Sequence, residues 1–247
     1  MFQEACRTIS ESVYGIKGVT PISVNQANVS TGTGFMIAPG LLATAAHVLH
    51  FEGNTAKNVH QKFDVIRAPD ISQKTEPAQF VAEDIAKDIA LLRITNPRSI
   101  KTIVLEPKIL NVGTSCGSLG FPLSFVDPQR GYCLDLRFQG AFISSFNKVG
   151  EFYETDALMY NGSSGCPVFT SDAHVFGMQD KSMTGEPAPI MPLVPQSRQQ
   201  RRQQMRQKQK LQAKNPLPKR QTDRFAISLS VPSTHIIAFA RSNGVNI

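Results

Sequence analysis

Three separate stretches of this chain carry side chains that could act together in nucleophilic catalysis. Ser164 lies in a glycine-flanked turn sequence, His47 follows two alanines at the end of an apolar run, and Asp88 directly precedes Ile-Ala-Leu-Leu. A serine hydroxyl is a weak nucleophile until a neighbouring imidazole removes its proton, and a carboxylate can fix the tautomer of that imidazole. These residue types therefore predict Ser164 as nucleophile, His47 as general base and then acid, and Asp88 as the group that orients His47.

The turn around Ser164 has a second predicted use. Attack on a carbonyl group creates an oxyanion, which preorganised backbone N–H groups stabilise where no side chain blocks the approach. We expect the N–H groups of Gly162 and Ser164 to form this oxyanion hole, because Gly162 can adopt backbone conformations that are closed to other residues.

The order His, Asp, Ser and the surrounding motifs resemble trypsin-fold serine proteases, and most closely the HtrA/Deg branch. Residues 155–167, Thr-Asp-Ala-Leu-Met-Tyr-Asn-Gly-Ser-Ser-Gly-Cys-Pro, follow that branch's Thr-Asp-Ala-Ala-Ile-Asn-Pro-Gly-Asn-Ser-Gly-Gly-Pro almost in register. Residues 31–37 resemble the strand before its histidine, residues 111–123 its Val-Gly … Gly-Asn-Pro-Leu stretch, and residues 224–227 its penultimate strand. The resemblance runs from about Val13 to the C-terminus. It implies an all-β fold of two six-stranded antiparallel barrels and peptide-bond hydrolysis without a cofactor.

Several positions depart from the pattern of this branch. This branch usually has Gly at the position of Cys166, Asn or Asp at that of Ser163, and Pro at that of Asn161. None of these changes removes a predicted catalytic group. Asp180 falls on the strand that lines the primary specificity pocket, near the catalytic Asp, where many relatives have Ser or Thr. A second carboxylate there would raise one pKa or face a basic partner, and the sequence assigns it no role. Leu158 stands where trypsin has an Asp, so we expect apolar rather than basic side chains at the cleavage site.

Other residues compete for the same roles. His50 and His60 could replace His47 as the base, but neither follows a run of small residues, and we expect both at the surface. Asp84 is less favoured than Asp88 because the apolar run starts directly after the latter. Cys166 could be the nucleophile, although a free Cys behaves as a small hydrophobe and we expect it to be a buried packing residue.

A metal centre is the other interpretation of the histidines. His47 and His50 could chelate a metal ion from one helix, but the sequence contains neither a His-Glu-x-x-His nor a Cys-x-x-Cys pair. We therefore predict no metal ion.

Composition fits a β-rich protein with a buried core, since 41% of the 247 residues are hydrophobic and 17 Gly and 16 Pro supply many turns. We expect short helices at residues 2–14 and 234–242, the latter capped by Ser233 or Thr234, and another at 43–48 carrying His47. The predicted strands are 34–37, 63–67, 89–94, 133–138, 168–169, 175–178 and 225–230. The first barrel would occupy residues 1–107 and the second residues 108–247, with an insertion at about 181–223.

The N-terminal sequence and the cysteines bear on the compartment. Four cysteines are too few for a disulfide scaffold, and no signal-peptide pattern or apolar run of about 18 residues is present. The sequence therefore predicts a soluble, intracellular protein, or a processed piece of a longer precursor. The expected last strand ends near Ser230, which leaves no room before Ile247 for the PDZ domain that many HtrA enzymes carry.

The chain's positive charge is concentrated in one segment, which begins at Arg198 and ends at Arg220. This segment holds nine Lys and Arg residues and no acid, whereas the net charge of the whole chain is +7. It also has no aromatic side chain on which bases could stack. We expect a solvated loop whose contacts with nucleic acid, membrane surfaces or acidic partners are electrostatic and salt-sensitive.

The predicted function is that of a serine endopeptidase acting through an acyl-enzyme intermediate. A viral polyprotein-processing protease on the same fold is a variant of this interpretation. The alternative from another class is an inactive protease-like protein that recruits acidic partners or nucleic acid through its basic loop.

Overall fold

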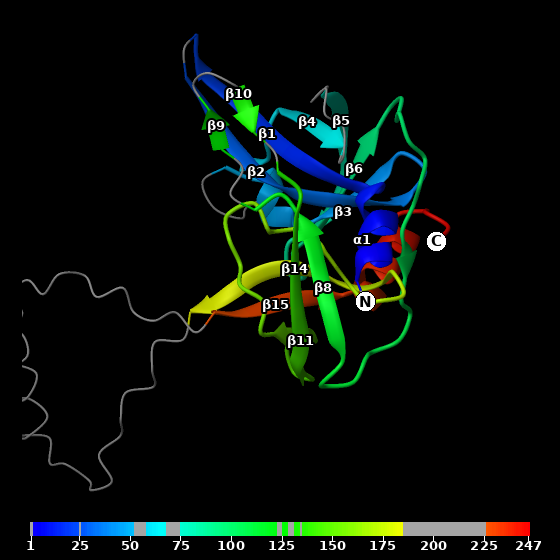
Figure 1. Ribbon diagram of the computed structural model, residues 1–247. Helices are drawn as coiled ribbons and strands as arrows, with labels where there is room; N and C mark the ends of the chain where they lie inside the picture. The colour runs from blue at the N-terminus through cyan, green and yellow to red at the C-terminus, as the bar shows by residue number, and fades with distance from the viewer. Residues whose placement is uncertain are drawn as a thin grey trace, which may run out of the picture. The chain divides into compact units, whose positions relative to one another are not determined.

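A computed structural model of the chain describes residues 2–24, 26–51, 58–67, 75–122, 125–127, 131–133, 135–184 and 226–247 (Figure 1). One compact unit comprises Met1–Ser182 and Ile227–Ile247. The segment from Arg198 to Arg220, with the polyanion contact predicted for it, lies outside the described residues.

Six strands close into a first antiparallel barrel in the order β1-β2-β3-β6-β5-β4. Every residue of β3 is buried, as are five of the six in β6, so these two strands read as continuous apolar runs rather than as alternating patterns. The strands are β1 (Val13–Ser23), β2 (Gln26–Ala38), β3 (Leu41–Thr44), β4 (Lys62–Arg67), β5 (Glu76–Asp84) and β6 (Ile89–Ile94).

A second set of six strands follows in the order β13-β8-β11-β12-β15-β14, and pairing of β13 with β14 closes it. These strands are β8 (Ser115–Gly120), β11 (Arg137–Asn147), β12 (Phe152–Thr155), β13 (Pro167–Phe169), β14 (His174–Thr184) and β15 (Ala226–Pro232). The short β7 (Val104–Leu105) adds to β14 in parallel, and β9 (Phe125–Asp127) pairs with β10 (Gly131–Cys133) as a separate ribbon. The predicted fold class, two six-stranded antiparallel barrels, is confirmed.

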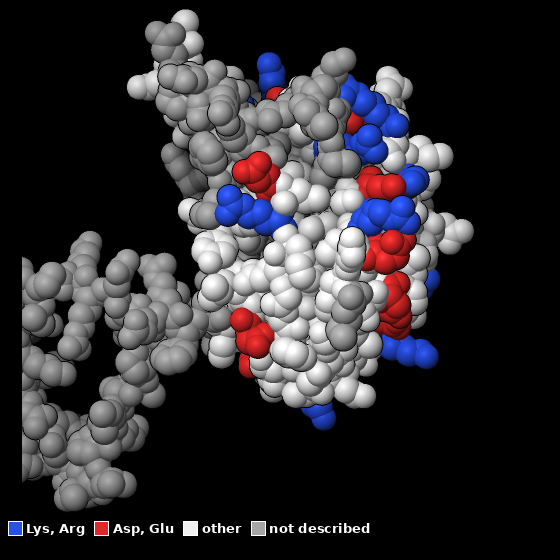
Figure 2. Space-filling view, in the orientation of Figure 1, with Lys and Arg blue, Asp and Glu red and all other residues white. Residues whose placement is uncertain are grey.

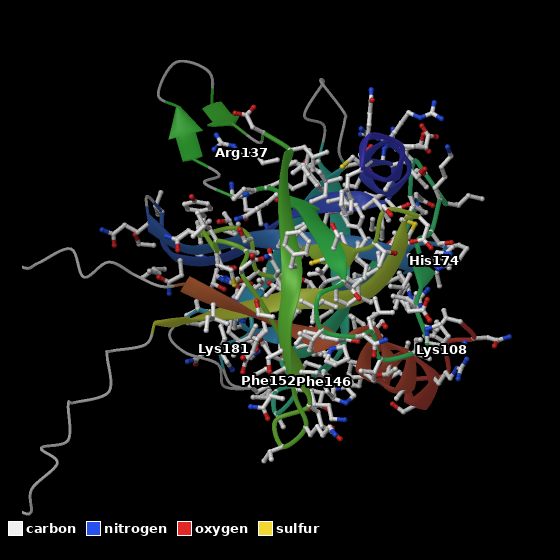
Figure 3. All side chains as sticks on the ribbon, turned by 60° about the horizontal axis from the view of Figure 1, so that its bottom comes forward. Lys108, Arg137, Phe146, Phe152, His174 and Lys181 are labelled. Atoms are coloured by element: carbon white, nitrogen blue, oxygen red, sulfur yellow. The ribbon has the colours of Figure 1, made fainter. Side chains whose placement is uncertain are left out.

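One hydrophobic core runs through both barrels and the terminal helices. It includes Ile9 of α1 (Gln3–Ser10), Leu42 and Leu91 of the first barrel, Val175 of the second, and Ile236 of α3 (Ser233–Ser242). A smaller aromatic cluster in the second barrel packs Tyr153 edge-to-face on Phe176 and Phe146; Figure 3 labels Phe146 beside Phe152 at the end of the β11–β12 hairpin. The continuous core fixes the first barrel against the second.

The helix predicted at residues 2–14 is shorter than expected, because α1 ends at Ser10 and Val13 already pairs with Phe35 in the barrel. Both Val13 and Tyr14 are fully buried, so strand pairing and burial outweigh the local helical pattern. The C-terminal helix begins at Ser233 instead of 234, but neither predicted cap acts as one. The Ser233 hydroxyl instead donates to the carbonyl oxygen of Glu106.

The strand predictions show a similar mixture. The predicted strand 89–94 is β6 itself, whereas the predicted strand 133–138 is wrong. β10 ends at Cys133 and β11 starts at Arg137, with the exposed Asp135 at the passage from the small ribbon to the barrel. The helix predicted at 43–48 is displaced, since Ala43 and Thr44 belong to β3 and the 3₁₀ helix η1 spans Ala46–Leu49. Phe225, the predicted first residue of the last strand, lies outside the described residues.

The predicted domain boundary between residues 107 and 108 lies between β7 and β8 and stays a prediction. β7 belongs to the predicted first domain but pairs with β14 of the second barrel, so its hydrogen bonds cross that boundary.

On the face shown in Figure 2, acidic and basic side chains lie beside one another on the side of α1, and the described residues form no large patch of one sign there.

Candidate active site

His47 is held at the point where an apolar strand of the first barrel ends. β3 is buried along its whole length, and the fully buried Ala45 and Ala46 follow it, so the chain can turn tightly against the core. The N–H of His50 donates to the carbonyl oxygen of His47, which closes the single turn of η1. The His47 side chain keeps 37% of its surface exposed and can reach a substrate.

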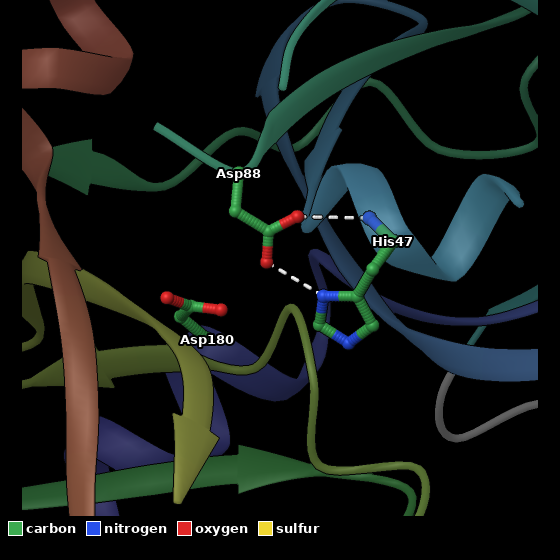
Figure 4. A group of neighbouring side chains, drawn as sticks. All are labelled: His47, Asp88 and Asp180. Atoms are coloured by element: carbon green, nitrogen blue, oxygen red, sulfur yellow. Dashed lines mark hydrogen bonds and ion pairs between the residues drawn. The ribbon is translucent and has the colours of Figure 1, made fainter. Parts of the chain in front are cut away.

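Asp88 lies beside His47 and holds it at two points (Figure 4). Its Oδ1 accepts the backbone N–H of His47 at 2.8 Å, and its Oδ2 accepts the ring Nδ1–H at 2.6 Å. Asp88 has the left-handed φ of +52° and immediately precedes β6, and the backbone N–H of Ala46 also donates to its carbonyl oxygen. The predicted pairing of His47 with Asp88 is therefore present in the structure, and it leaves Nε2 of His47 pointing away from Asp88.

The electrostatics of this pair favour the charged forms. Burial on its own would raise the pKa of Asp88 and lower that of His47. Hydrogen bonding and mutual attraction outweigh burial for both groups, so the pKa of Asp88 falls below its usual value and the pKa of His47 rises above it. A negative Asp88 thus supports the imidazolium that a general base becomes once it has taken a proton.

Ser164 lies on a tight turn of the second barrel that leads into β13. Gly162 has φ +94°, and a Cβ at this position would approach the carbonyl oxygen of Phe121 to 2.3 Å; Gly165 has φ +83° and meets the carbonyl oxygen of Thr33 in the same way. Neither position can accept a side chain without rearrangement. The N–H of Gly165 donates to the carbonyl oxygen of Gln179 at 2.7 Å, which fixes the turn to β14.

The two predicted oxyanion-hole donors are available. Within the described part of the chain, the backbone N–H groups of Gly162 and Ser164 donate to no protein acceptor. The hydroxyl of Ser164 donates to the carbonyl oxygen of Asp180 at 3.3 Å, and among the described residues no hydrogen bond joins it to His47. Catalytic hydrogen bonds are often formed only once substrate is bound, so this arrangement is compatible with a serine that turns toward His47.

Asp180 also lies in this site, although no role could be assigned to it from the sequence. One oxygen of its carboxyl group lies within 4.8 Å of both a ring nitrogen of His47 and a carboxylate oxygen of Asp88. Asp180 is only 9% exposed, and burial together with the nearby charge of Asp88 raises its pKa above the usual carboxyl range. Its position on the pocket strand was a signal in the sequence, but the distance to Asp88 depends on how β14 packs across the core.

The rivals for the catalytic roles lie elsewhere, and the prediction that His50 and His60 are surface residues is wrong. His50 is 5% and His60 3% exposed. Nε2 of His50 is bonded to Glu83 at 2.6 Å, and Nδ1 of His60 is bonded to the hydroxyl of Thr20 at 3.0 Å. Hydrogen bonds to these partners on neighbouring strands offset the free-energy cost of burying the imidazoles. The local sequence around each histidine does not indicate these partners.

Asp84 and Cys166 also fall outside the predicted catalytic roles. Asp84 accepts the backbone N–H of Lys87 at 3.1 Å and so closes the turn before Asp88. Cys166 is 2% exposed, as predicted for a packing residue, and burial raises the pKa of its thiol to about 12. A thiol held in this protonated form is a poor nucleophile. Cys6, Cys116 and Cys166 form no disulfide.

Two cavities flank the site. One of about 510 Å³ is lined by His47, Asp88 and Asp180 and also by Phe152 and Lys181, the last two of which are labelled in Figure 3. The other, of about 310 Å³, lies behind the turn and is lined in part by the following residues: Ser163, Cys166, Tyr160 and Gln179. Leu158, the predicted pocket residue, is 47% exposed and lines neither of these two cavities in the described structure.

The grouping of His47, Asp88 and Asp180 also has the composition of a metal site. Nδ1 of His47 and Oδ2 of Asp88, however, are 2.6 Å apart and share a proton, so a metal ion would have to displace this hydrogen bond. The geometry matches a hydrogen-bonded pair, and we assign no metal to it.

Comparison with known proteins agrees with this geometry. A family model described as a trypsin-like peptidase domain matches residues 32–178, which span β2 to β14 and contain all three predicted catalytic residues. The chain belongs to this family.

Curated relatives carry the resemblance to the HtrA/Deg branch, which is thereby confirmed. A protein of Rickettsia prowazekii (strain Madrid E), named "Probable periplasmic serine endoprotease DegP-like", is 27% identical over 168 residues, which cover 64% of this chain and 29% of the relative. Serine protease HTRA4 of Mus musculus is 25% identical over 208 residues, which cover 81% of this chain and 39% of the relative. The chain thus spans well under half the length of these relatives.

A solved structure shares the fold. The crystal structure of the serine endoprotease from Yersinia pestis superposes with a TM-score of 0.64 at 15% identity and covers 98% of this chain and 66% of that chain. At this identity the likeness concerns the fold alone. Among the described residues, no helix is both long and apolar enough to cross a membrane.

Proposed function

We propose that the chain is a serine endopeptidase that hydrolyses peptide bonds with His47, Asp88 and Ser164. The observation that carries this proposal is the pair of hydrogen bonds between Asp88 and His47, at 2.8 and 2.6 Å. In addition, the N–H groups of Gly162 and Ser164 have no acceptor among the described residues. Membership of the trypsin-like peptidase family supports it.

The reaction would begin with a rotation of the Ser164 hydroxyl away from the carbonyl oxygen of Asp180. His47 Nε2 then takes the hydroxyl proton while Oγ attacks the substrate carbonyl carbon, and Asp88 stabilises the resulting imidazolium. The N–H groups of Gly162 and Ser164 hold the oxyanion. His47 next gives its proton to the departing amine, which leaves an acyl group on Ser164, and a water molecule activated by His47 removes that acyl group.

Labelling with a fluorophosphonate probe, together with hydrolysis of a peptide library, tests the proposal. Wild-type protein should react at Ser164, and Ser164→Ala should abolish labelling and lower hydrolysis by roughly 10⁶-fold. Ser171→Ala, which removes an exposed serine from the turn between β13 and β14, is the matched control and should behave as wild type. Retained activity in Ser164→Ala together with lost activity in Cys166→Ala would contradict the assignment of the nucleophile.

The second candidate function is a protease-like binding protein without activity. It is favoured by one observation, namely that the Ser164 hydroxyl bonds to the Asp180 carbonyl oxygen at 3.3 Å instead of to His47. A wild-type protein that is folded but neither labels nor hydrolyses any peptide would support this candidate. In that case the basic segment from Arg198 to Arg220 would recruit acidic partners or nucleic acid.

Substrate preference and location stay predictions. Leu158 and the lack of an acid at its position favour cleavage next to apolar side chains. The sequence predicts an intracellular protein, whereas the Rickettsia relative is periplasmic by its name.

A further inference from the structure

Asp180 lies next to both Ser164 and Asp88 of the proposed catalytic site. Its backbone carbonyl oxygen accepts the Ser164 hydroxyl at 3.3 Å, while its carboxyl group lies within 4.8 Å of a carboxylate oxygen of Asp88. In Figure 4 this carboxyl group lies beside that of Asp88. The preceding residue, Gln179, accepts the N–H of Gly165 and donates its own N–H to Cys166, so Asp180 has a fixed position relative to the nucleophile.

Two buried carboxyl groups at this separation do not share equal protonation. Asp88 is 7% and Asp180 9% exposed, and placing a negative charge on both would be costly. Asp88 receives two hydrogen bonds from His47 and so is the better place for the charge. The cationic partner of Asp180 is Lys181, at 3.3 Å, and that side chain is 66% exposed and screened by solvent.

We propose that Asp180 is a positioning residue of this site, whose carboxyl group keeps its proton at neutral pH and donates it in a hydrogen bond to Asp88. Its catalytic meaning rests on the proposed endopeptidase function. Asp88 would then accept three hydrogen bonds, two from His47 and one from Asp180, which fixes its orientation and holds its negative charge in place. Burial and the charge of Asp88, which raise the pKa of Asp180, act in the same direction.

The arrangement links the protonation of Asp180 to that of His47. Loss of the Asp180 proton places a second negative charge near the ring, and ionised Asp180 then raises the pKa of His47 as Asp88 does. When the two groups hold a single proton between them, it can reside on either group, and of these two forms only the one with neutral His47 and protonated Asp180 can accept the proton of Ser164. The other charged or titratable groups lining the same cavity are Lys87, Glu151, Lys181 and His235.

Variants at one position separate the hydrogen bond from the charge. Asp180→Thr and Asp180→Val introduce side chains of nearly the same shape, but only the threonine hydroxyl can donate a hydrogen bond to Asp88. Asp180→Asn keeps a donor and removes the titration. We expect Asp180→Thr and Asp180→Asn to retain kcat within a few-fold at their optimum, and Asp180→Val to lose about tenfold or more. Asp172→Asn, which removes an exposed carboxylate from the turn between β13 and β14, controls for net charge and should leave all parameters unchanged.

The pH profile tests the link to His47. The acidic limb of kcat/KM should be broad in the wild type because two coupled groups lose protons there. In Asp180→Asn it should become a single ionisation that is complete at a pH lower by about one unit. Lys181→Gln should leave the acidic limb at the same pH or move it to higher pH, because Lys181 favours the ionised form of Asp180.

An NMR titration of the His47 ring keeps this test independent of activity. Histidine-labelled wild type, Asp180→Asn and Asp180→Thr would be compared, with His47→Gln to assign the signal among the five histidines. A two-step titration in the wild type that becomes one step in both variants would support the proposal even if no peptide were hydrolysed. An identical His47 titration in all three proteins, or equal kcat in Asp180→Val and Asp180→Thr, would overturn it.

Discussion

The backbone N–H of Thr33 donates a hydrogen bond of 2.8 Å to the carbonyl oxygen of Ser164. Thr33 lies on β2 of the first barrel, and Ser164 lies on the turn before β13 of the second. The hydroxyl of the same threonine donates to the carbonyl oxygen of Gly162 at 2.8 Å and accepts the N–H of Phe121 at 3.0 Å. One fully buried residue of the first barrel thus fixes the two peptide units that flank the proposed oxyanion hole, one through its backbone N–H and the other through its hydroxyl.

Thr33→Val should lower kcat on a peptide substrate by about 10- to 100-fold with a smaller change in KM. Valine keeps the shape but cannot donate to the buried carbonyl oxygen of Gly162, and the loss of this hydrogen bond costs about 1–3 kcal/mol. It also removes the acceptor that the Thr33 hydroxyl offers to the N–H of Phe121. Without the hydrogen bond to Gly162 the Ser164 turn should shift, and the N–H groups that hold the oxyanion should shift with it. Steady-state kinetics and a thermal melt would be measured on the same preparation.

Thr31→Val serves as the control for this change. Thr31 lies two residues earlier on β2 and is only partly buried, so its replacement alters the same strand without touching the Ser164 turn. Equal kcat values in Thr33→Val and Thr31→Val would show that the hydroxyl of Thr33 does not position the turn.

Gly162→Ala should abolish measurable hydrolysis, by more than about 100-fold, because a Cβ there meets the Phe121 carbonyl oxygen at 2.3 Å and requires φ +94°. Gly113→Ala separates these two effects. Gly113 also has a left-handed φ, +83°, but its Cβ would have nothing within 4 Å. It should lose about 1–2 kcal/mol of stability from backbone strain and keep full activity. Kinetics and urea unfolding of both variants would be compared, and an active Gly162→Ala would remove Gly162 from the oxyanion hole.

The pairing of His47 with Asp88 could be predicted from the sequence, but the contacts of Thr33 and Asp180 that hold the site in place could not. His47 and Asp88 were predictable because each adjoins a short apolar run that becomes a buried strand, β3 or β6, and the strands bring them together. The hydroxyl of Thr33 was not predictable as a link, since nothing local to it indicates that it faces Gly162 in the other barrel. Asp180 was visible as a departure from the family pattern, yet its proximity to Asp88 follows only from tertiary packing.

The errors in the fold prediction have a common physical origin. Residues 2–14 show a helical pattern, but Val13 and Tyr14 gain more by pairing in β1 and by full burial. His50 and His60 are polar types that are usually exposed, and their burial depends on Glu83 and Thr20, which approach from strands distant in sequence. In each case a non-local contact outweighs the local preference that the sequence displays.

His60 should make the fold sensitive to acid. Burial and a neighbouring charge on His50 lower the pKa of His60, so the unfolded chain takes up the proton at a higher pH than the folded chain does. The stability associated with neutral His60 is therefore complete above about pH 6.5 and is lost as the pH falls through the lowered folded pKa. Urea unfolding between pH 8 and 5 should show this loss in the wild type and a shallower dependence in His60→Asn, which keeps an acceptor or donor near Thr20. His174→Asn, at a more exposed histidine, should retain the wild-type dependence, and the same slope in His60→Asn would contradict the prediction.

Cleavage should favour small or medium apolar side chains at the scissile bond. A cation in the pocket would lose water without gaining an anionic partner at Leu158, which costs several kcal/mol. Profiling a peptide library with wild-type protein and with Leu158→Asp would measure this, and the variant should gain cleavage after Lys or Arg. Dominant cleavage after Lys or Arg by the wild type would instead identify an acid elsewhere, with Asp180 the nearest candidate to the reacting groups.

The segment from Arg198 to Arg220 should govern binding to polyanions and leave the chemistry untouched. Its nine cations outnumber the chain's net charge of +7, so their loss turns the protein slightly acidic. Deleting residues 198–220 with a short Gly-Ser bridge, or replacing the nine cations by Gln at constant length, should abolish retention on heparin, and wild-type binding should weaken steeply as salt is raised. The composition of the segment, with few apolar residues, predicts no part in a hydrophobic core, so the melting temperature and fluorophosphonate labelling of Ser164 should persist in both variants. Loss of folding or labelling in the deletion but not in the Gln variant would show that the segment is needed for the active site through its backbone and not its charge, contrary to this prediction.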